Sequence, residues 1–134
     1  MVRIFLVDDN PMIRSHLRSL LEKNEEWVVV GEAEDGRNAV ERWHEVSPHV
    51  TVMDFVMPEM DGLEAGRQLS QQHPESPVLM VTIDPSQQLE QEAKKAGIKG
   101  LCAKADLHSL SAAVEALLKG KTYFHRWEPA FART

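Results

Sequence analysis

The sequence contains a single cysteine, Cys102, among 134 residues. One thiol cannot form an intrachain disulfide and cannot assemble a thiolate metal site alone, so the chain is not a disulfide-stapled or thiolate-metal domain. Long apolar runs are missing too, because none approaches the roughly 20 residues that cross a bilayer. The N-terminal run MVRIFLV stops at two acids, which is too short and too soon acidic for a signal peptide. These absences predict a cytoplasmic protein without membrane association.

Positive charge is also in short supply. Lys and Arg number 15 against 21 Asp and Glu, which leaves a formal net charge of -6. A free-standing nucleic-acid binder usually carries an excess of basic residues that neutralise phosphates, so we expect no direct nucleic-acid binding by this chain. The remaining composition, 43% hydrophobic and 27% charged residues, is typical of a folded globular domain. The length fits one domain with a core of adequate size.

Short β-branched runs alternate with longer segments of helical period along the chain. Strands are predicted over residues 2–7, 27–30, 50–53, 78–83 and 98–103. Helices are predicted from Pro11 to Leu21, around residues 39–43, around 63–69, and over 85–96 and 107–118. Asn10 before Pro11 is typical of a helix start, and Gly97 of a helix end. Five strands alternating with five helices predict an α/β fold with one doubly wound parallel sheet.

In such a sheet, ligands bind outside the carboxyl ends of the strands, where the strand order reverses. The chemically distinctive residues lie at those ends: Asp8 and Asp9, Asp54, Thr82 and Lys104. If the first and third strands are neighbours, the three carboxylates converge. Clustered carboxylates repel one another unless a cation lies among them, and an all-oxygen ligand set suits Mg²⁺. A hydroxyl and an ammonium facing the acids suit a phosphoryl group attached to one of them.

Each of these residues has a plainer interpretation when it is taken alone. Asp8 and Asp9 can simply end a strand before a helix cap, and Asp54 can be a turn residue. Thr82 can be an ordinary strand residue and Lys104 a solvated charge. Their joint occurrence at four strand ends, in this chain order, favours a functional site.

The same residues lie in the segments IFLVDDN, VMDFVMPEMDGLE, VTID and GLCAKAD. With these segments the sequence resembles the receiver domain of bacterial two-component response regulators, over roughly residues 2–119. The resemblance implies a flavodoxin-like fold with strand order 2-1-3-4-5, a receiver over residues 1–121, and a C-terminal tail or the start of an interdomain linker over 122–134. The stretch KADLHSLSAAVEALLKGKTYF is similar to receivers of LuxR-type regulators, which carry a C-terminal helix-turn-helix domain.

The resemblance implies that Asp54 is the phosphoacceptor. It also implies a site for Mg²⁺ (or Mn²⁺) with Asp9 as a direct ligand, Asp8 holding the ion through water, Asp54 as a further ligand, and Val56 contributing its backbone carbonyl. Thr82 is expected to contact the phosphoryl group.

By the same resemblance, Lys104 contacts the phosphoryl group as well, and the donor is a phosphohistidine on a histidine kinase or phosphotransfer protein. The chain is then a signalling switch that acts through protein contacts. It is not an enzyme beyond Mg²⁺-dependent self-phosphorylation and self-dephosphorylation. Pairing of two copies after phosphorylation is a further expectation.

Three positions depart from the family pattern. Leu101 stands where the family usually has an aromatic residue that rotates on activation, so an aromatic rotamer switch cannot operate there. Ala105 follows the lysine where many members have proline, and we therefore expect no cis peptide. Ile83 is bulkier than the small residue that often follows the switch hydroxyl, and we expect it to narrow access to Asp54.

The sequence also bears on three other functions. The chain is either a free-standing receiver or the receiver fragment of a DNA-binding regulator whose output domain lies elsewhere. An aspartyl phosphohydrolase normally has an Asp-x-Asp arrangement after the first strand, whereas Asp8 and Asp9 are adjacent here. A flavodoxin-like electron carrier needs a phosphate loop at that place, where the two acids repel phosphate.

The remaining conspicuous side chains have structural interpretations. Trp27 and Trp43 are expected to pack in the core, and the six histidines are too dispersed for a metal site. The C-terminal aromatic residues either pack back on the domain or form a surface for a partner, with packing or partial disorder favoured; they are Tyr123, Phe124, Trp127 and Phe131.

Overall fold

A computed structural model describes residues 1–125, in which five strands alternate with five α-helices. The strands are β1 (Val2–Val7), β2 (Trp27–Ala33), β3 (Val50–Asp54), β4 (Val78–Thr82) and β5 (Gly100–Ala103). The helices are α1 (Pro11–Leu21), α2 (Gly36–Val46), α3 (Gly62–Gln72), α4 (Gln87–Ala96) and α5 (Leu110–Leu118), the last preceded by a 3-10 turn over Leu107–Ser109. All strands pair in parallel in the order β2-β1-β3-β4-β5. The predicted fold class and strand order are confirmed.

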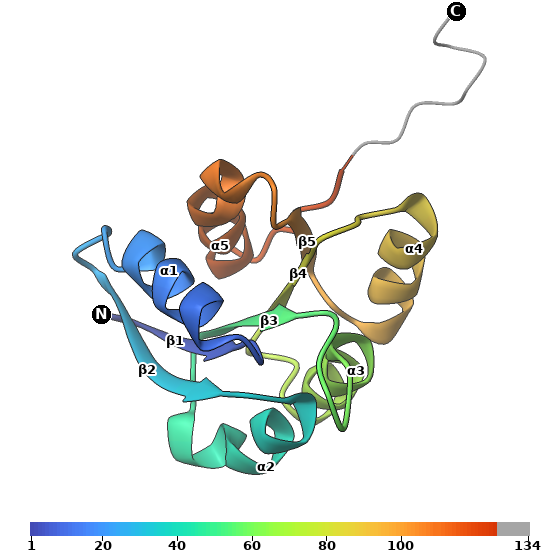
Figure 1. Ribbon diagram of the computed structural model, residues 1–134, viewed down its shortest axis with the longest axis horizontal. Helices are drawn as coiled ribbons and strands as arrows, with labels where there is room; N and C mark the ends of the chain where they lie inside the picture. The colour runs from blue at the N-terminus through green and yellow to red at the C-terminus, as the bar shows by residue number, and fades with distance from the viewer. Residues whose placement is uncertain (126–134) are drawn as a thin grey trace, which may run out of the picture.

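Helices cover both faces of the sheet (Figure 1). Helices α1 and α5 pack on one face, where Leu17 and Val114 join a buried apolar cluster with Ile4 and Leu6 of β1. Helices α2, α3 and α4 pack on the other face around Phe5. Within residues 1–125, no helix combines the length and apolar character needed to cross a membrane.

The helix ends follow the predicted chemistry. Asn10 accepts hydrogen bonds from the backbone N–H groups of Met12 and Ile13, at 2.9 and 3.2 Å, and Pro11 occupies the first turn of α1. Gly97 ends α4 in the left-handed region with φ of 89°. Asp35 caps α2 by accepting a hydrogen bond from the backbone N–H of Asn38, the third residue of the helix.

Several strand boundaries differ from the predicted ones. Strand β2 continues past Val30 to Ala33, because its pairing with β1 extends through residues of low strand propensity after a register shift between Ile4 and Phe5. Strand β4 ends at Thr82 rather than Ile83. Strand β5 starts at Gly100 rather than Ile98.

The late start of β5 has a local cause. The backbone N–H of Ile98 donates to the carbonyl of Ala93, so Ile98 still belongs to the C-terminal cap of α4. Helix α4 in turn begins at Gln87 rather than Pro85, since Ser86 accepts a hydrogen bond from the N–H of Leu89 and is the N-cap.

Residues 121–125, which we call the C-terminal strap, lie along the free edge of β5. The N–H of Tyr123 donates to the carbonyl of Lys99, and the N–H of Leu101 donates to the carbonyl of Tyr123, both at 2.9 Å. Phe124 packs against the cluster that contains Leu101, with the Lys94 ammonium 4.9 Å from the centre of its ring. The strap therefore covers an edge that would otherwise present unpaired backbone groups.

The packing expected for the C-terminal aromatic residues is thus confirmed for Tyr123 and Phe124. Trp127 and Phe131 lie outside the described residues. Trp27 and Trp43 are both buried, as predicted.

Candidate functional site

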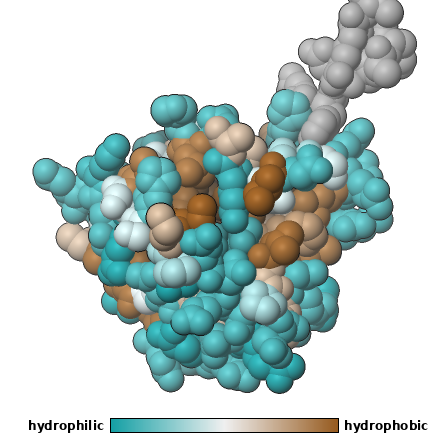
Figure 2. Space-filling view, viewed as in Figure 1, coloured by the Kyte–Doolittle hydropathy of each residue, from teal (hydrophilic) through white to brown (hydrophobic). Residues whose placement is uncertain are grey.

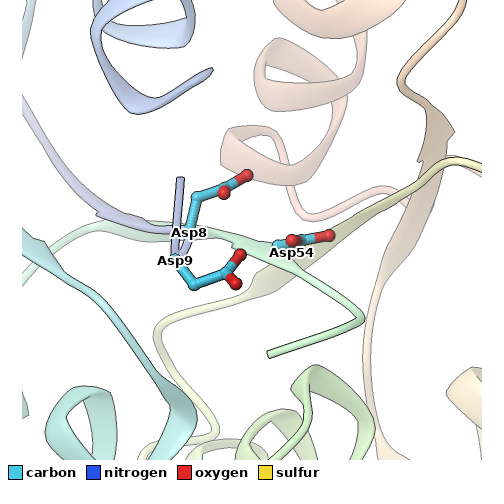
Figure 3. A group of neighbouring side chains, drawn as sticks. All are labelled: Asp8, Asp9 and Asp54. Carbon is cyan, nitrogen blue, oxygen red and sulfur yellow. The ribbon is translucent and has the colours of Figure 1, made fainter. Parts of the chain in front are cut away.

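Three acids meet at the carboxyl end of the sheet (Figure 3). Asp8 and Asp9 directly follow β1, and Asp54 is the last residue of the neighbouring strand β3. One carboxylate oxygen from each lies within 4.8 Å of the others. Asp8 is 1% exposed and Asp54 5%, whereas Asp9 reaches solvent. The convergence predicted from the strand ends is confirmed.

Asp8 is held by its backbone N–H and by one of its carboxylate oxygens. Its N–H donates to the carbonyl of Ala33 at 3.1 Å, which continues the β1–β2 pairing, and its Oδ1 accepts from the N–H of Asn10 at 2.9 Å. Its Oδ2 is buried and has no hydrogen bond. The nearest cation to that oxygen is the Lys104 ammonium, at 3.4 Å. A buried carboxylate oxygen without a hydrogen bond is costly, and an ion in the site satisfies it.

Lys104 brings the positive charge that faces the acids. Its Nζ lies 3.0 Å from Asp54 Oδ2, and its backbone N–H donates to the carbonyl of Thr82 at 2.7 Å. Burial works against the charge on Lys104, but the hydrogen bond and charge of Asp54, together with Asp8, outweigh burial and raise the pKa of the lysine. The ammonium is therefore positive at neutral pH.

Neighbouring groups and burial act on the pKa of Asp54 in opposite directions. Burial raises the pKa of its carboxyl group, and the charges of Asp8 and Asp9 add to that increase. The hydrogen bond and charge of Lys104 act in the other direction, but the net shift remains upward. The carboxylate is thus crowded by negative charge on one side and neutralised on the other.

The other predicted site residues lie in β4, in β5 and directly after β3. Thr82 is buried at the end of β4, one position beyond Val81, which pairs with Asp54 across the sheet. Val56 is the second residue after β3 and is 68% exposed. Leu101 is buried within β5, three positions before Lys104.

The residues present fit a hard divalent cation. The donor set consists of carboxylate oxygens, one of which is buried without a hydrogen bond, and such oxygens are the preferred ligands of Mg²⁺. Among residues 1–125, these acids are the only group of three or more His, Cys, Asp or Glu with atoms close enough to share a metal ion.

Sequence reasoning missed two features of the molecule. The guanidinium of Arg14 donates to the backbone carbonyl of Asp8 at 2.6 Å, a contact signalled only by a basic residue one turn into the helix that follows the acids. The ring of His73 stacks on that of Trp43 with centroids 3.5 Å apart, and His44 meets His73 edge-on. Nothing in the spacing of the histidines indicates that pairing.

Known proteins share this fold and these segments. Residues 4–115 match the family model described as the response regulator receiver domain. The transcriptional regulatory protein YdfI of Bacillus subtilis is 34% identical over 119 residues, which cover 85% of this chain and 55% of that protein. The chemotaxis protein CheY of Listeria monocytogenes is 36% identical over 104 residues, which cover 78% of this chain and 87% of that protein. The chain spans a little over half the length of the first curated relatives that it matches.

Solved structures agree with the sequence relatives. A two-component response regulator of the LuxR family from an Aurantimonas species superposes with a TM-score of 0.88 at 33% identity, over 99% of this chain and 94% of that one. The isolated receiver domain of RcsB from Salmonella enterica gives a TM-score of 0.84 at 25% identity, over 93% and 94%. The predicted resemblance, including its LuxR-type branch, is confirmed. With the family match over most of its length and an acidic pocket at the expected strand ends, this chain belongs to the response regulator receiver domains, signalling modules that are mostly non-enzymatic and take up a phosphoryl group on an aspartate.

Proposed function

We propose that Asp54 is the residue of this chain that accepts the phosphoryl group. The observation that carries the proposal is the pocket itself: Asp54 ends β3 beside Asp8 and Asp9, and Lys104 places its ammonium 3.0 Å from an Asp54 oxygen. A carboxylate that faces both acids and a fixed cation is suited to bear a dianionic group only if further positive charge is supplied.

That further charge is proposed to come from Mg²⁺ (or Mn²⁺), held by Asp8, Asp9 and Asp54 and by the backbone carbonyl of Val56. When bound, the ion neutralises charge that develops on the phosphoryl oxygens. The all-oxygen donor set and the buried Asp8 Oδ2 support this assignment.

The chemistry is a transfer from a histidine nitrogen of the donor to an oxygen of Asp54. The N–P bond of the phosphohistidine breaks as the new O–P bond forms in line with it, and the released imidazole takes up a proton from water. Lys104, already paired with Asp54, follows the charge to a phosphoryl oxygen, and Thr82 donates its hydroxyl to another. Later hydrolysis of the acyl phosphate by water restores the carboxylate and releases phosphate.

The donor is proposed to be a histidine kinase or phosphotransfer protein, as in the family. Figure 2 shows that hydrophilic side chains cover most of one face, with apolar groups exposed in its middle. The exposed apolar side chains of the described residues include Met12, Val56 and Ile83, each one to three positions beyond a site residue. Apolar groups that surround a charged pocket favour a protein as the donor.

The output side of the switch is proposed to act through protein contacts, with pairing of two copies as one form. A second function, the receiver part of a DNA-binding regulator, is favoured by one observation: the relatives named transcriptional regulatory proteins are matched over only 53% to 55% of their length. Leu101 takes the place of the usual aromatic residue in either case. A cytoplasmic location stays a prediction.

Acetyl phosphate with Mg²⁺ tests the phosphoacceptor directly. The chain is expected to gain one phosphoryl group by mass spectrometry, and Asp54→Asn is expected to abolish the gain. Asp84→Asn serves as the control, because this exposed acid lies two residues beyond Thr82 and outside the acidic cluster. An adduct that persists in Asp54→Asn would contradict the assignment.

The cation proposal has its own test. Calorimetric titration with Mg²⁺ is expected to show binding that Asp9→Asn weakens by about tenfold or more, because one carboxylate ligand of the hard cation is lost. Equal affinity in the parent and in Asp9→Asn would remove Asp9 from the site.

A further inference from the structure

Arg14 connects the acidic pocket to the body of the domain. It lies one turn into α1, and its side chain is 14% exposed. Its Nη1 donates to the backbone carbonyl of Asp8 at 2.6 Å, while its Nε donates to Glu32 Oε1 at 2.9 Å. One planar guanidinium thus joins the residue after β1 to a residue near the end of β2.

Glu32 is itself anchored, so Arg14 has a fixed support. The other carboxylate oxygen of Glu32 accepts from Arg18, which lies four positions after Arg14 on the same face of α1. Arg18 also donates to the carbonyl of Val29 at 3.0 Å, and Arg42 of α2 donates to the backbone carbonyl of Glu32. Because Arg14, Arg18 and Arg42 contact Glu32 at different atoms, the loss of Arg18 leaves the Arg14–Glu32 pair in place.

The carbonyl that Arg14 holds belongs to the peptide that joins Asp8 to Asp9. The direction of that peptide sets where the Asp9 side chain leaves the backbone. Asp8 is restrained independently by its N–H and by its Oδ1, as described above. Asp9 is exposed, and its placement depends on the peptide that Arg14 fixes.

We propose that Arg14 is a positioning residue: by holding the Asp8 carbonyl against Glu32, it aims the Asp9 carboxylate into the cation site. This inference rests on the proposed cation site and deepens it. It assigns to a side chain outside the pocket the pre-organisation of a proposed Mg²⁺ ligand. Residues that orient metal ligands without touching the metal commonly change metal affinity by 10- to 100-fold.

Three variants test the proposal, with Mg²⁺ itself as the probe. Arg14→Met keeps the length of the side chain but removes both donors. Arg14→Lys keeps the charge but cannot donate to Glu32 and to the Asp8 carbonyl in the fork geometry. Arg18→Met is the matched control, because it also breaks a pair with Glu32 yet leaves the Asp8 carbonyl alone. Calorimetry is expected to show Mg²⁺ affinity about tenfold lower in Arg14→Met, partly restored in Arg14→Lys, and within about twofold of the parent in Arg18→Met.

A second readout works without metal. NMR relaxation of the backbone amides is expected to show larger motion at Asp9 in Arg14→Met than in the parent or in Arg18→Met. Parent-like Mg²⁺ affinity and amide motion in Arg14→Met overturn the positioning role while the proposed function stands. An equal loss of affinity in Arg18→Met also overturns it, because the network as a whole would then be responsible.

A parent chain that binds no Mg²⁺ is a different failure. That result removes the cation site of the proposed function and, with it, the purpose assigned to Arg14. If Arg14→Met does not fold, the comparison of Arg14→Lys with Arg18→Met decides by the same two measurements.

Discussion

The β1–β3 side and the β4–β5 side of the acidic pocket differ in the hydrogen bonds that hold them. On the β1–β3 side, Asp8 is bonded through its N–H, its carbonyl and its Oδ1. After Asp54, Phe55 donates to Val81 and accepts from Gly62, which ties both ends of the loop to the sheet. On the β4–β5 side, the short edge strand β5 carries Lys104, and one backbone bond joins Lys104 to Thr82.

The difference separates two tasks. The β1–β3 side holds three negative charges close together, which requires a backbone that cannot relax away from the repulsion. The β4–β5 side carries the hydroxyl and the ammonium, which have to follow a phosphoryl group when it arrives. Among the described residues, the C-terminal strap covers its outer edge through two backbone bonds, the Phe124 contact and a bond from the His125 N–H to Glu90. We expect conformational change to spread along β5, α4 and the strap, and the opposite side to stay fixed.

Alanine substitutions at Gly62 and at Gly100 are expected to give the largest difference in unfolding free energy between the two sides. A Cβ on Gly62 would lie 2.1 Å from the carbonyl oxygen of Asp54, a backbone atom that cannot give way. A Cβ on Gly100 would meet the flexible ends of Leu79 and Leu117 at 2.8 and 3.1 Å and the strap carbonyl of Tyr123 at 3.1 Å. Urea unfolding is expected to show a loss of about 3 kcal/mol for Gly62→Ala and about 1 kcal/mol for Gly100→Ala.

The same pair of variants tests function. Gly62→Ala is expected to impair Mg²⁺ binding, because the carbonyl that the new methyl displaces belongs to Asp54. Gly100→Ala is expected to leave Mg²⁺ affinity close to that of the parent and to loosen the strap instead. Equal losses of stability and affinity in the two variants would break the comparison.

Phe124→Ala tests the β4–β5 side alone, which we call the adjustable side. The ring is half-buried against the cluster around Leu101, and the Lys94 ammonium lies over it. Its removal is expected to cost about 1.5 kcal/mol of unfolding free energy and to speed hydrogen exchange at the Leu101 amide, which donates to the strap. Lys95→Met is the control, expected to cost under about 0.5 kcal/mol because Lys95 is exposed on the same helix as Lys94. Unchanged exchange at Leu101 in Phe124→Ala would mean that the strap is held without its aromatic anchor.

The β1–β3 side of the pocket, which we call the fixed side, was more predictable from the sequence than the adjustable side. Asn10 and Pro11 act within a few residues of their own position, and strand-end acids in a parallel sheet must share one edge. The alternation of strand and helix patterns predicted the fold class, and the meeting of Asp8, Asp9 and Asp54 followed once the first and third strands were taken as neighbours, as the resemblance implied. The boundaries of β2 and β5 were missed because strand pairing and a helix cap, respectively, override local propensity.

No sequence pattern comparable to these indicated the strap or the Arg14 contact. Tyr123 pairs with Gly100 as a neighbour in space, and Arg14 reaches Glu32 across eighteen positions of the chain. Neither distance produces a periodicity that can be recognised in one sequence. The stack of His73 on Trp43 is of the same kind, since it joins α2 to the end of α3.

His73, at the opposite end of the sheet, is expected to have a smaller effect, on the pH dependence of stability. It caps the C-terminus of α3 at 8% exposure, and burial lowers the pKa of its imidazole, with His44 adding to the shift and Glu75 opposing it. The unfolded chain therefore takes up a proton near the ordinary pKa that the folded chain rejects. The contribution to stability is complete above about pH 6.5 and is lost as the pH falls.

Measured stability between pH 5 and 8 is expected to depend less on pH in His73→Phe, which keeps an aromatic ring beside Trp43 but cannot be protonated. His16→Gln is the control, because His16 is exposed on α1. Asp54 has the opposite sign: its raised pKa gives stability that is present at low pH and lost as the pH rises. A pH dependence unchanged in His73→Phe would assign the slope to other groups.

Ile83 and Val56 give the smallest change in stability and compare the two sides of the pocket mouth. Both side chains are exposed, at 77% and 68%, so truncation to alanine is expected to alter the unfolding free energy by less than about 0.5 kcal/mol. Ile83 directly follows Thr82 on the adjustable side, and removing its bulk is expected to speed phosphorylation by acetyl phosphate about threefold, or ~0.6 kcal/mol of barrier. Val56→Ala is expected to leave the rate near that of the parent, since its proposed contribution is a backbone carbonyl that truncation retains. A rate gain in Val56→Ala equal to that in Ile83→Ala would mean that access to Asp54 is controlled from both sides of the mouth. The division into a fixed and an adjustable side would then not extend to the entrance of the site.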